Sequence, residues 1–226
     1  MFLPYDSSEC RTYEIQGGKT MKEKWLTTKN LVLMAMFGAL GGVLMLFEFP
    51  LVFLAPSFYG LDLSEVPVLV GTFAMGPGAG VIIELVKIVM KLVLKPTTTG
   101  FVGEFANFVI GCSLVVPAGI IYHAKKSKKS AIYGMIAGTV IMTVAGVVIN
   151  AVVMLPFYSN VMPLETIIAA GSAINPAVSN IWTFAIICVG PFNLVKGIVV
   201  SFVTQLVYKR ISNLIHSVGR EQKRRG

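Results

Sequence analysis

The chain alternates between long apolar stretches and short polar ones. Apolar residues dominate six segments, which cover about 28–48, 64–76, 79–95, 103–123, 130–155 and 184–208. Because a transmembrane helix needs about 20 mostly apolar residues, this pattern predicts an all-α polytopic membrane protein with six transmembrane helices. Helix-breaking residues stand between segments, as at Pro50 and at Gly76-Pro77-Gly78.

The break after the first segment, residues 49–63, is unlike an ordinary surface loop. Its prolines and Gly60 exclude a continuous helix, yet it is apolar and aromatic. Non-helical backbone near membrane depth is tolerated where protein buries it or where it lines a cavity. We therefore expect a non-helical outward loop that covers an apolar ligand, with Tyr59 and Leu61 among the contacts. The alternative is a plug that packs across the helix ends.

Charge patterning gives the expected orientation. Fifteen of the 19 Lys and Arg residues lie in the N-terminal segment, in the cluster at 125–129 and in the C-terminal tail. Six spans place all three basic regions on one side, which agrees with the positive-inside rule. Both termini are therefore expected in the cytoplasm of a prokaryotic cell, and the loops 49–63, 95–102 and 156–183 face outward. The net charge of +8 is explained in this way without a nucleic-acid partner.

Composition supports one membrane domain. Hydrophobic residues make up 55% of the chain, charged residues 13%, and the mean hydropathy is +0.76. We divide the chain into an N-terminal extension (1–24), expected to be disordered, a six-helix substrate-binding domain (25–212) and a basic cytoplasmic tail (213–226). The weakly apolar stretch 156–183 is expected to hold a short helix near 163–173.

Lys196 is the most informative single residue. It lies within the apolar run ICVGPFNLVKGIVVSFVTQLVY, where a charge costs at least a few kcal/mol and usually marks a pathway or a ligand site. A lysine near a helix end can instead extend its ammonium to the headgroups. Lys196 is far from either end of the run, which favours the functional interpretation.

Other polar residues accompany this lysine. Asn107, Asn150 and Asn193 lie in apolar segments, and Gly100 stands in a threonine-rich turn before the fourth segment. Amides and an ammonium among aromatic residues suit a flat heteroaromatic ligand with carbonyl and imide edges. The alternative for an intramembrane asparagine is a hydrogen bond between helices.

Acidic residues admit similar alternatives. Asp62 is a candidate ligand contact, although it also suits the start of the second helix. Glu84, Lys87 and Lys91 share one helical face, so Glu84 and Lys87 are spaced to form an ion pair.

Small residues in the first segment suggest a partner. Ala35 and Ala39 are four positions apart and give a smooth helix face for close packing, either internal or against another membrane subunit. The sequence contains no GxSxG, HExxH or Walker A motif, so we expect no enzyme activity and no ATP hydrolysis by this chain. We also expect no metal site and no cofactor.

Several motifs together resemble the riboflavin-specific S components (RibU family) of energy-coupling factor, or ECF, transporters. They are the Ala35–Ala39 pattern, FEFPLVFLAP with LDLSEVP, TFAMGPGAG, GFVGEFANFVIG, INAVVMLPFY and GPFNLVKGIVVSF. The resemblance covers about residues 25–215. It implies a six-helix subunit that captures riboflavin from outside and associates with a transmembrane coupling subunit and two ATPase subunits.

The resemblance also implies residue roles. Asn150 and Lys196 match flavin-ring contacts of the family, and Ala35 and Ala39 match the surface that docks on the coupling subunit. Two alternatives remain: an S component for another vitamin, such as thiamine, and a small membrane enzyme. A site centred on Lys196 is expected to repel cationic thiamine.

Overall fold

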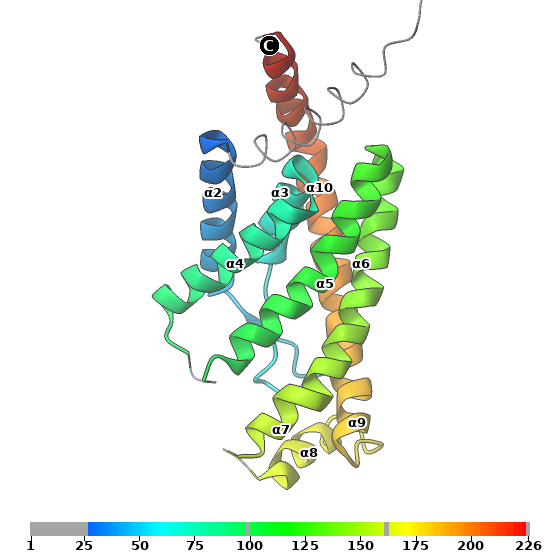
Figure 1. The fold of residues 1–226 in the computed structure, drawn as a ribbon. Coiled ribbons are helices and arrows are strands. Elements are labelled where there is room, and N and C mark those ends of the chain that lie inside the picture. Colours follow the sequence, from blue (N-terminus) through cyan, green and yellow to red (C-terminus); the bar gives the residue numbers. More distant parts are fainter. Residues whose placement is uncertain (1–26, 98–99, 161–162, 225–226) are drawn as a thin grey trace, which may run out of the picture.

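The computed structural model describes residues 27–97, 100–160 and 163–224, with side chains as far as residue 208. The helices run in the order α2 (Thr28–Leu44), α3 (Glu65–Met75), α4 (Pro77–Leu94), α5 (Val102–Lys125), α6 (Lys128–Ile149), α7 (Leu155–Tyr158), α8 (Leu164–Ser172), α9 (Ile181–Phe184) and α10 (Gly190–Arg224). Two π-helical segments, η1 (Asn150–Met154) and η2 (Ala185–Val189), join α6 to α7 and α9 to α10. Figure 1 shows the resulting bundle.

Each of the six apolar segments contains a helix, and most helix bounds lie within a few residues of those expected, except that α10 continues to Arg224. Three continuous stretches are long and apolar enough to cross a membrane: Val102–Lys125, Lys128–Tyr158 and Ile181–Tyr208. The apolar helices α2 and α3 are shorter. The expected extension 1–24 lies outside the described residues, and the backbone of the expected tail continues α10 as far as Arg224.

The first helix ends at Leu44 rather than near residue 48. Phe49 and Pro50 form a short strand, β1 (Phe49–Pro50), which pairs antiparallel with β2 (Gly60–Leu61). A residue before proline avoids the helical region, which favours ending the helix before Phe49. The break after α2 is therefore a loop closed by a two-residue ribbon.

The apolar interior has two parts. One cluster lies between α3, α4, α5, α6 and α10 and includes Leu69, Ile83 and Leu114. The other lies beneath the 49–63 loop and includes Leu155, Phe184 and Phe192, with Tyr59 and Leu61 packed against it. The loop therefore covers an apolar layer. This agrees both with a loop that covers an apolar ligand and with a plug that packs across the helix ends.

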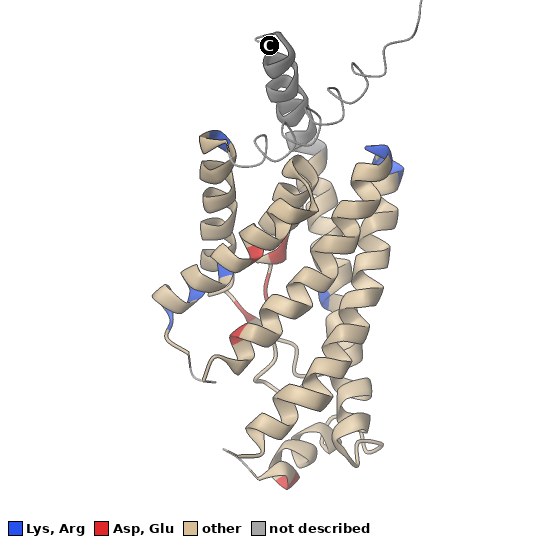
Figure 2. Ribbon diagram, viewed as in Figure 1, with Lys and Arg blue, Asp and Glu red and all other residues tan. Residues whose placement is uncertain are grey.

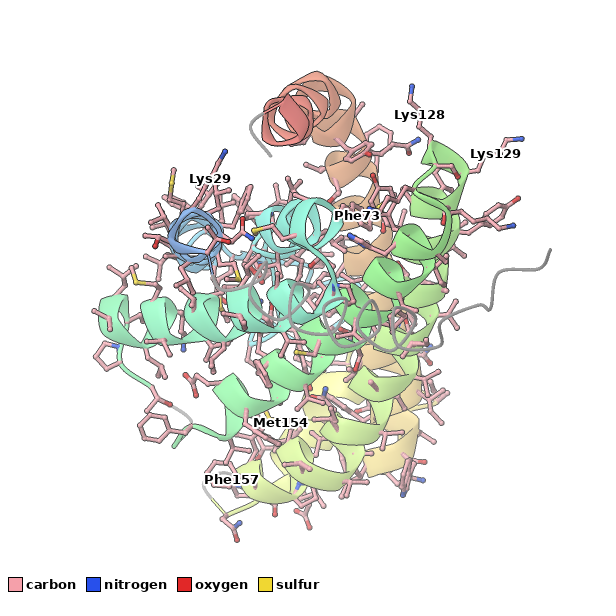
Figure 3. All side chains as sticks on the ribbon, turned by 45° about the horizontal axis from the view of Figure 1, so that its top comes forward. Lys29, Phe73, Lys128, Lys129, Met154 and Phe157 are labelled. Carbon is pink, nitrogen blue, oxygen red and sulfur yellow. The ribbon has the colours of Figure 1, made fainter. Side chains whose placement is uncertain are left out.

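Basic residues mark one end of the bundle. Lys29 on α2 and Lys128 and Lys129 on α6 lie at the end that comes forward in Figure 3, while Met154 and Phe157 lie toward the opposite end. In Figure 2 the lysines at the ends of α2, α5 and α6 are on the side toward which α10 extends. α7, α8 and α9 lie at the other end, and the 49–63 loop lies between α2 and that end (Figure 1).

Candidate functional site

The predicted lysine is buried and paired. Lys196 on α10 is 7% exposed, and its Nζ donates a hydrogen bond to Oδ2 of Asp62 over 2.8 Å. Asp62 follows β2 in the 49–63 loop and is 4% exposed. The loop residue and the helix residue are 134 positions apart in the sequence, so this ion pair closes the loop over the bundle.

The carboxylate of Asp62 is held in its charged form. Its Oδ1 accepts hydrogen bonds from the backbone N–H of Ser64, over 2.8 Å, and from the Ser64 hydroxyl. Burial alone would raise the pKa of Asp62, but the nearby Lys196 and Lys87 ammonium groups and these hydrogen bonds lower it to about 2. Asp62 therefore acts at the start of α3 and as the counter-ion of Lys196, and its contact with a ligand stays a prediction.

A second polar contact links the loop to α6. The hydroxyl of Tyr59 donates to Oδ1 of Asn150 over 2.7 Å, and Nδ2 of Asn150 donates to the carbonyl of Gly146 over 2.8 Å. The Tyr59 ring lies 5.7 Å from the Phe192 ring, centroid to centroid. Burial raises the pKa of Tyr59 above its ordinary value, so the hydroxyl keeps its proton and donates.

Asn193 lies beside this contact. Its Nδ2 donates to the carbonyl of Val189 over 3.0 Å. A Cβ atom at Gly146 would lie 2.6 Å from Nδ2 of Asn193, so α6 and α10 approach closely here only because residue 146 is glycine. Asn150 and Asn193 therefore reach the same short section of α6 from two helices.

The two π-helical segments flank this site. Asn150 is the first residue of η1, and η2 ends directly before α10, which carries Asn193 and Lys196. The two segments contact each other. Such single-turn π segments occur frequently at functional sites. The apolar pattern of the sequence predicted continuous α-helix at both positions.

A proline follows each of the two π segments at the same distance. Pro156 stands two residues after the end of η1, and Pro191 stands two residues after the end of η2. A proline lacks the N–H of a helical hydrogen bond and its ring crowds the preceding turn, which favours a wider turn there. Pro117 within α5 has no such segment, so proline alone is not sufficient.

Other predicted residues lie elsewhere. Oδ1 of Asn107 on α5 is 3.3 Å from Nζ of Lys87, in a separate charged cluster. Gly100 has a left-handed φ of 55°, and a Cβ there would contact Phe157. The structure therefore packs Tyr59 and Leu61 against the apolar layer and pairs Tyr59 with Asn150 and Asp62 with Lys196. It gives Asn107 and Gly100 different neighbours.

A ladder of lysines runs along α4. Lys87, Lys91 and Lys95 recur every four residues, and each is paired with a glutamate. Lys87 contacts Glu65 and Glu84, Lys91 contacts Glu104, and Lys95 contacts Glu48. The expected Glu84–Lys87 pair is confirmed, with 2.5 Å between Nζ and Oε1. Burial decreases along the ladder, from a fully buried Lys87 to a half-exposed Lys95.

The predicted docking residues are on α2. Ala35 is exposed and Ala39 is half-buried, while Met34, Gly38, Gly41 and Gly42 form the buried face. Large apolar residues beside them, Met36 and Leu40, are 62% and 52% exposed. Ala35 is therefore on the outer face of α2, whereas Ala39 lies between the outer and the buried face.

The residues around Lys196 and Asn150 suit recognition of a ligand through hydrogen bonds and aromatic contacts rather than catalysis. The site offers an ammonium, two amides and a phenol beside aromatic rings, which suits a flat polar heterocycle. Within the described residues, no group of three or more His, Cys, Asp and Glu side chains is arranged to hold a metal ion.

Comparison with known proteins decides the family. The family described as ECF transporter, substrate-specific component, matches residues 29–208. The chain belongs to this family. It is therefore a substrate-specific component of an ECF transporter, a membrane protein, and not an enzyme.

Individual relatives agree with this assignment. The riboflavin transporter RibU of Staphylococcus aureus is 36% identical over 190 residues, which cover 84% of this chain and 94% of the relative. The riboflavin transporter FmnP of Bacillus subtilis is 30% identical over 187 residues, which cover 82% of this chain and 93% of that protein. A solved S component of a bacterial ECF transporter superposes with a TM-score of 0.65 at 36% identity, covering 83% of this chain and 97% of that structure.

Proposed function

We propose that this substrate-specific component binds riboflavin beneath the 49–63 loop. The proposal is supported by two polar contacts of this loop with the helices, Tyr59 with Asn150 and Asp62 with Lys196, and by the Phe192 ring beside Tyr59. The similarity to proteins named riboflavin transporters supports the same ligand.

The polar groups match the edge of a flavin ring. One edge of the isoalloxazine carries two carbonyl oxygens and an imide N–H. An ammonium has three N–H donors. Among the described residues, Lys196 donates one hydrogen bond, to Asp62. Asn150 offers both a donor and an acceptor on one amide. We expect Lys196 to donate to a flavin carbonyl and Asn150 to pair with the imide edge in place of the Tyr59 hydroxyl.

The ion pair with Asp62 changes the effect that Lys196 is expected to have on cationic thiamine. Lys196 alone would repel cationic thiamine, but the Lys196–Asp62 pair is neutral overall. Selectivity against thiamine must therefore come from the shape and hydrogen bonds of the site. Competition by thiamine therefore tests the shape and the hydrogen bonds of the site rather than its charge.

Flavin binding is tested by titrating riboflavin into the purified chain and recording flavin and tryptophan fluorescence. We expect quenching that saturates at about one flavin per chain. Flavin mononucleotide serves as a flavin-containing competitor, and saturating thiamine and biotin serve as controls that should not displace riboflavin. Displacement by thiamine or biotin as effective as that by flavin mononucleotide would contradict the specificity.

We also propose the membrane topology. α2, α3, α4, α5, the stretch from α6 to α7 and the stretch from α9 to α10 are six membrane helices, with the basic end and both termini in the cytoplasm. The lysines at the ends of α2, α5 and α6 support this orientation (Figure 2). Labelling of single cysteines by a membrane-impermeant maleimide in whole cells should modify position 58 but not position 128.

The proposed partners are a transmembrane coupling subunit and two ATPase subunits. Ala35 lies on the outer face of α2 and Ala39 at its edge, where they support a close helix–helix contact. Enlarging both to tryptophan should leave riboflavin binding near normal and abolish uptake and copurification with the coupling subunit. Enlarging Ile136 on the outer face of α6, which is 56% exposed, is the matched control. Normal uptake by the Ala35/Ala39 double variant would place the docking face elsewhere.

A further inference from the structure

The Lys87 cluster contains more acid than base. Oε1 of Glu65 on α3 and Oε1 of Glu84 on α4 each lie 2.5 Å from Nζ of Lys87. The three residues are 2%, 0% and 0% exposed, respectively. Two carboxyl groups therefore share one ammonium deep in the bundle.

No second cation balances this cluster among the described residues. Asn107, 3.3 Å from Lys87, is neutral. The adjacent charges are already paired: Lys91 contacts Glu104, and Asp62 contacts Lys196. An uncompensated charge buried in an apolar interior is strongly unfavourable.

The unused oxygens of the two carboxyl groups also need a partner. Oε2 of Glu65 and both side-chain oxygens of Glu84 are buried and make no hydrogen bond with described residues, although Oε1 of Glu84 lies within ion-pair distance of Lys87. Gly111 on α5 brings the groups together: a Cβ there would lie 2.3 Å from Oε1 of Glu84 and 3.0 Å from Oε1 of Glu65. The glycine therefore makes room for two neighbouring carboxyl groups at one point.

We propose that Glu65 and Glu84 together bind one proton at neutral pH. The proton is taken from water as the bundle folds, and the resulting carboxylic acid donates a hydrogen bond to the other carboxylate. Lys87 then neutralises the remaining negative charge. Two like charges that share a site commonly hold a proton in this way. This proposal is independent of the ligand that the chain transports.

The bound proton links stability to pH. If the folded chain binds a proton that the unfolded chain releases, the free energy of unfolding falls as pH rises. Replacing one carboxyl group with an amide supplies a permanent N–H donor in place of the acid. The amide variant should therefore retain stability at neutral pH and lose the dependence on pH.

The experiment measures thermal unfolding of the purified full chain in detergent between about pH 6 and pH 9. We expect E84Q to unfold near the temperature of the unaltered chain at neutral pH and to exceed it increasingly at higher pH. E104Q is the matched control, because it leaves Lys91 without its carboxylate; it should unfold at a lower temperature at every pH. The double variant E65Q/E84Q removes both counter-ions of Lys87 and should show the largest loss.

Infrared spectroscopy gives a direct readout of the proton. The unaltered chain should show a carboxylic acid band that shifts in heavy water, and this band should be missing from E84Q. Riboflavin binding by E84Q provides a check that the variant is folded. Equal pH dependence of E84Q and the unaltered chain, with no lost band, would overturn the proposal. Stabilisation of the unaltered chain but not E84Q by sodium, relative to choline, would also overturn it in favour of a sodium ion.

Discussion

Two buried lysines, Lys87 and Lys196, lie in contrasting surroundings. Lys87 is fully buried between helices and contacts two carboxyl groups, Glu65 and Glu84. Lys196 is also buried, but it contacts one carboxylate, Asp62, which comes from a loop. Lys196 also lies one helical turn from Asn193 and follows a π-helical segment, whereas α4 around Lys87 is regular helix.

The contrast shows that burial alone does not identify a ligand-binding lysine. Lys87 is surrounded by acids, so its charge is more than balanced within the protein. Lys196 forms a one-to-one pair with a carboxylate from a loop, so its charge is balanced but not exceeded within the protein. This contrast supports the proposal that Lys87 stabilises the bundle and that Lys196 contacts the ligand.

Removing Lys87 should produce the largest effect. In Lys87→Met, Glu65 and Glu84 lose their ammonium partner, and breaking such a buried pair costs about 3–5 kcal/mol of stability. Chemical unfolding in detergent measures this loss. Lys95→Met is the matched control, because the Lys95–Glu48 pair is half-exposed and exposed pairs contribute little. Equal stability of Lys87→Met and Lys95→Met would show that Lys87 stabilises the bundle no more than an exposed ion pair does, and would contradict the role assigned to Lys87.

Removing Lys196 should reduce affinity more than stability. A lost hydrogen bond from a charged donor costs about 2–3 kcal/mol, so we expect the riboflavin Kd of Lys196→Met to rise roughly 30- to 160-fold. Fluorescence titration of the folded fraction measures this change. An unchanged Kd would assign Lys196, like Lys87, to stability alone.

Asn150 should have a smaller effect because its hydrogen bonds are between neutral groups. Asn150→Ala is expected to weaken riboflavin binding by about 1–2 kcal/mol. Tyr59→Phe keeps the aromatic ring and removes the hydroxyl that donates to Asn150. If flavin replaces that hydroxyl, Tyr59→Phe should bind at least as well as the unaltered chain, and weaker binding would place the hydroxyl on the ligand.

The smallest expected effect is that of pH on affinity. The pKa of Asp62 is lowered to about 2, so its carboxylate stays charged and keeps its partner as pH falls toward 5. The contribution of this pair to stability is present above the ordinary aspartate pKa and is lost only as pH falls through about 2. Riboflavin Kd should therefore be constant between about pH 5 and pH 8, and a steep change there would show that Asp62 or Lys196 titrates.

Several features of the two lysines and their helices could be predicted from local sequence. Apolar runs predicted the helices, including short α8, because their length and pattern are local properties. The Glu84–Lys87 pair followed from helical spacing. The functional interpretation of Lys196 followed from its place in an apolar run.

The partners of these residues depend on tertiary contacts. Asp62 reaches Lys196 across 134 positions, and Glu65 joins the Lys87 cluster from α3, which no local pattern indicates. Asn107 was grouped with Asn150 because both are intramembrane amides, yet the tilt and packing of α4 and α5 place it against Lys87. The π segments also escaped prediction, although a proline follows each at the same offset.

The most direct measurement of the proposed ligand site is a structure of the chain with riboflavin bound. We predict one flavin beneath the 49–63 loop, with its ring edge within hydrogen-bond distance of Asn150 and Lys196, and with Glu65 and Glu84 still in contact with Lys87. A flavin bound instead against Asn107 and Lys87 would reverse the roles assigned to the two buried lysines and contradict this account.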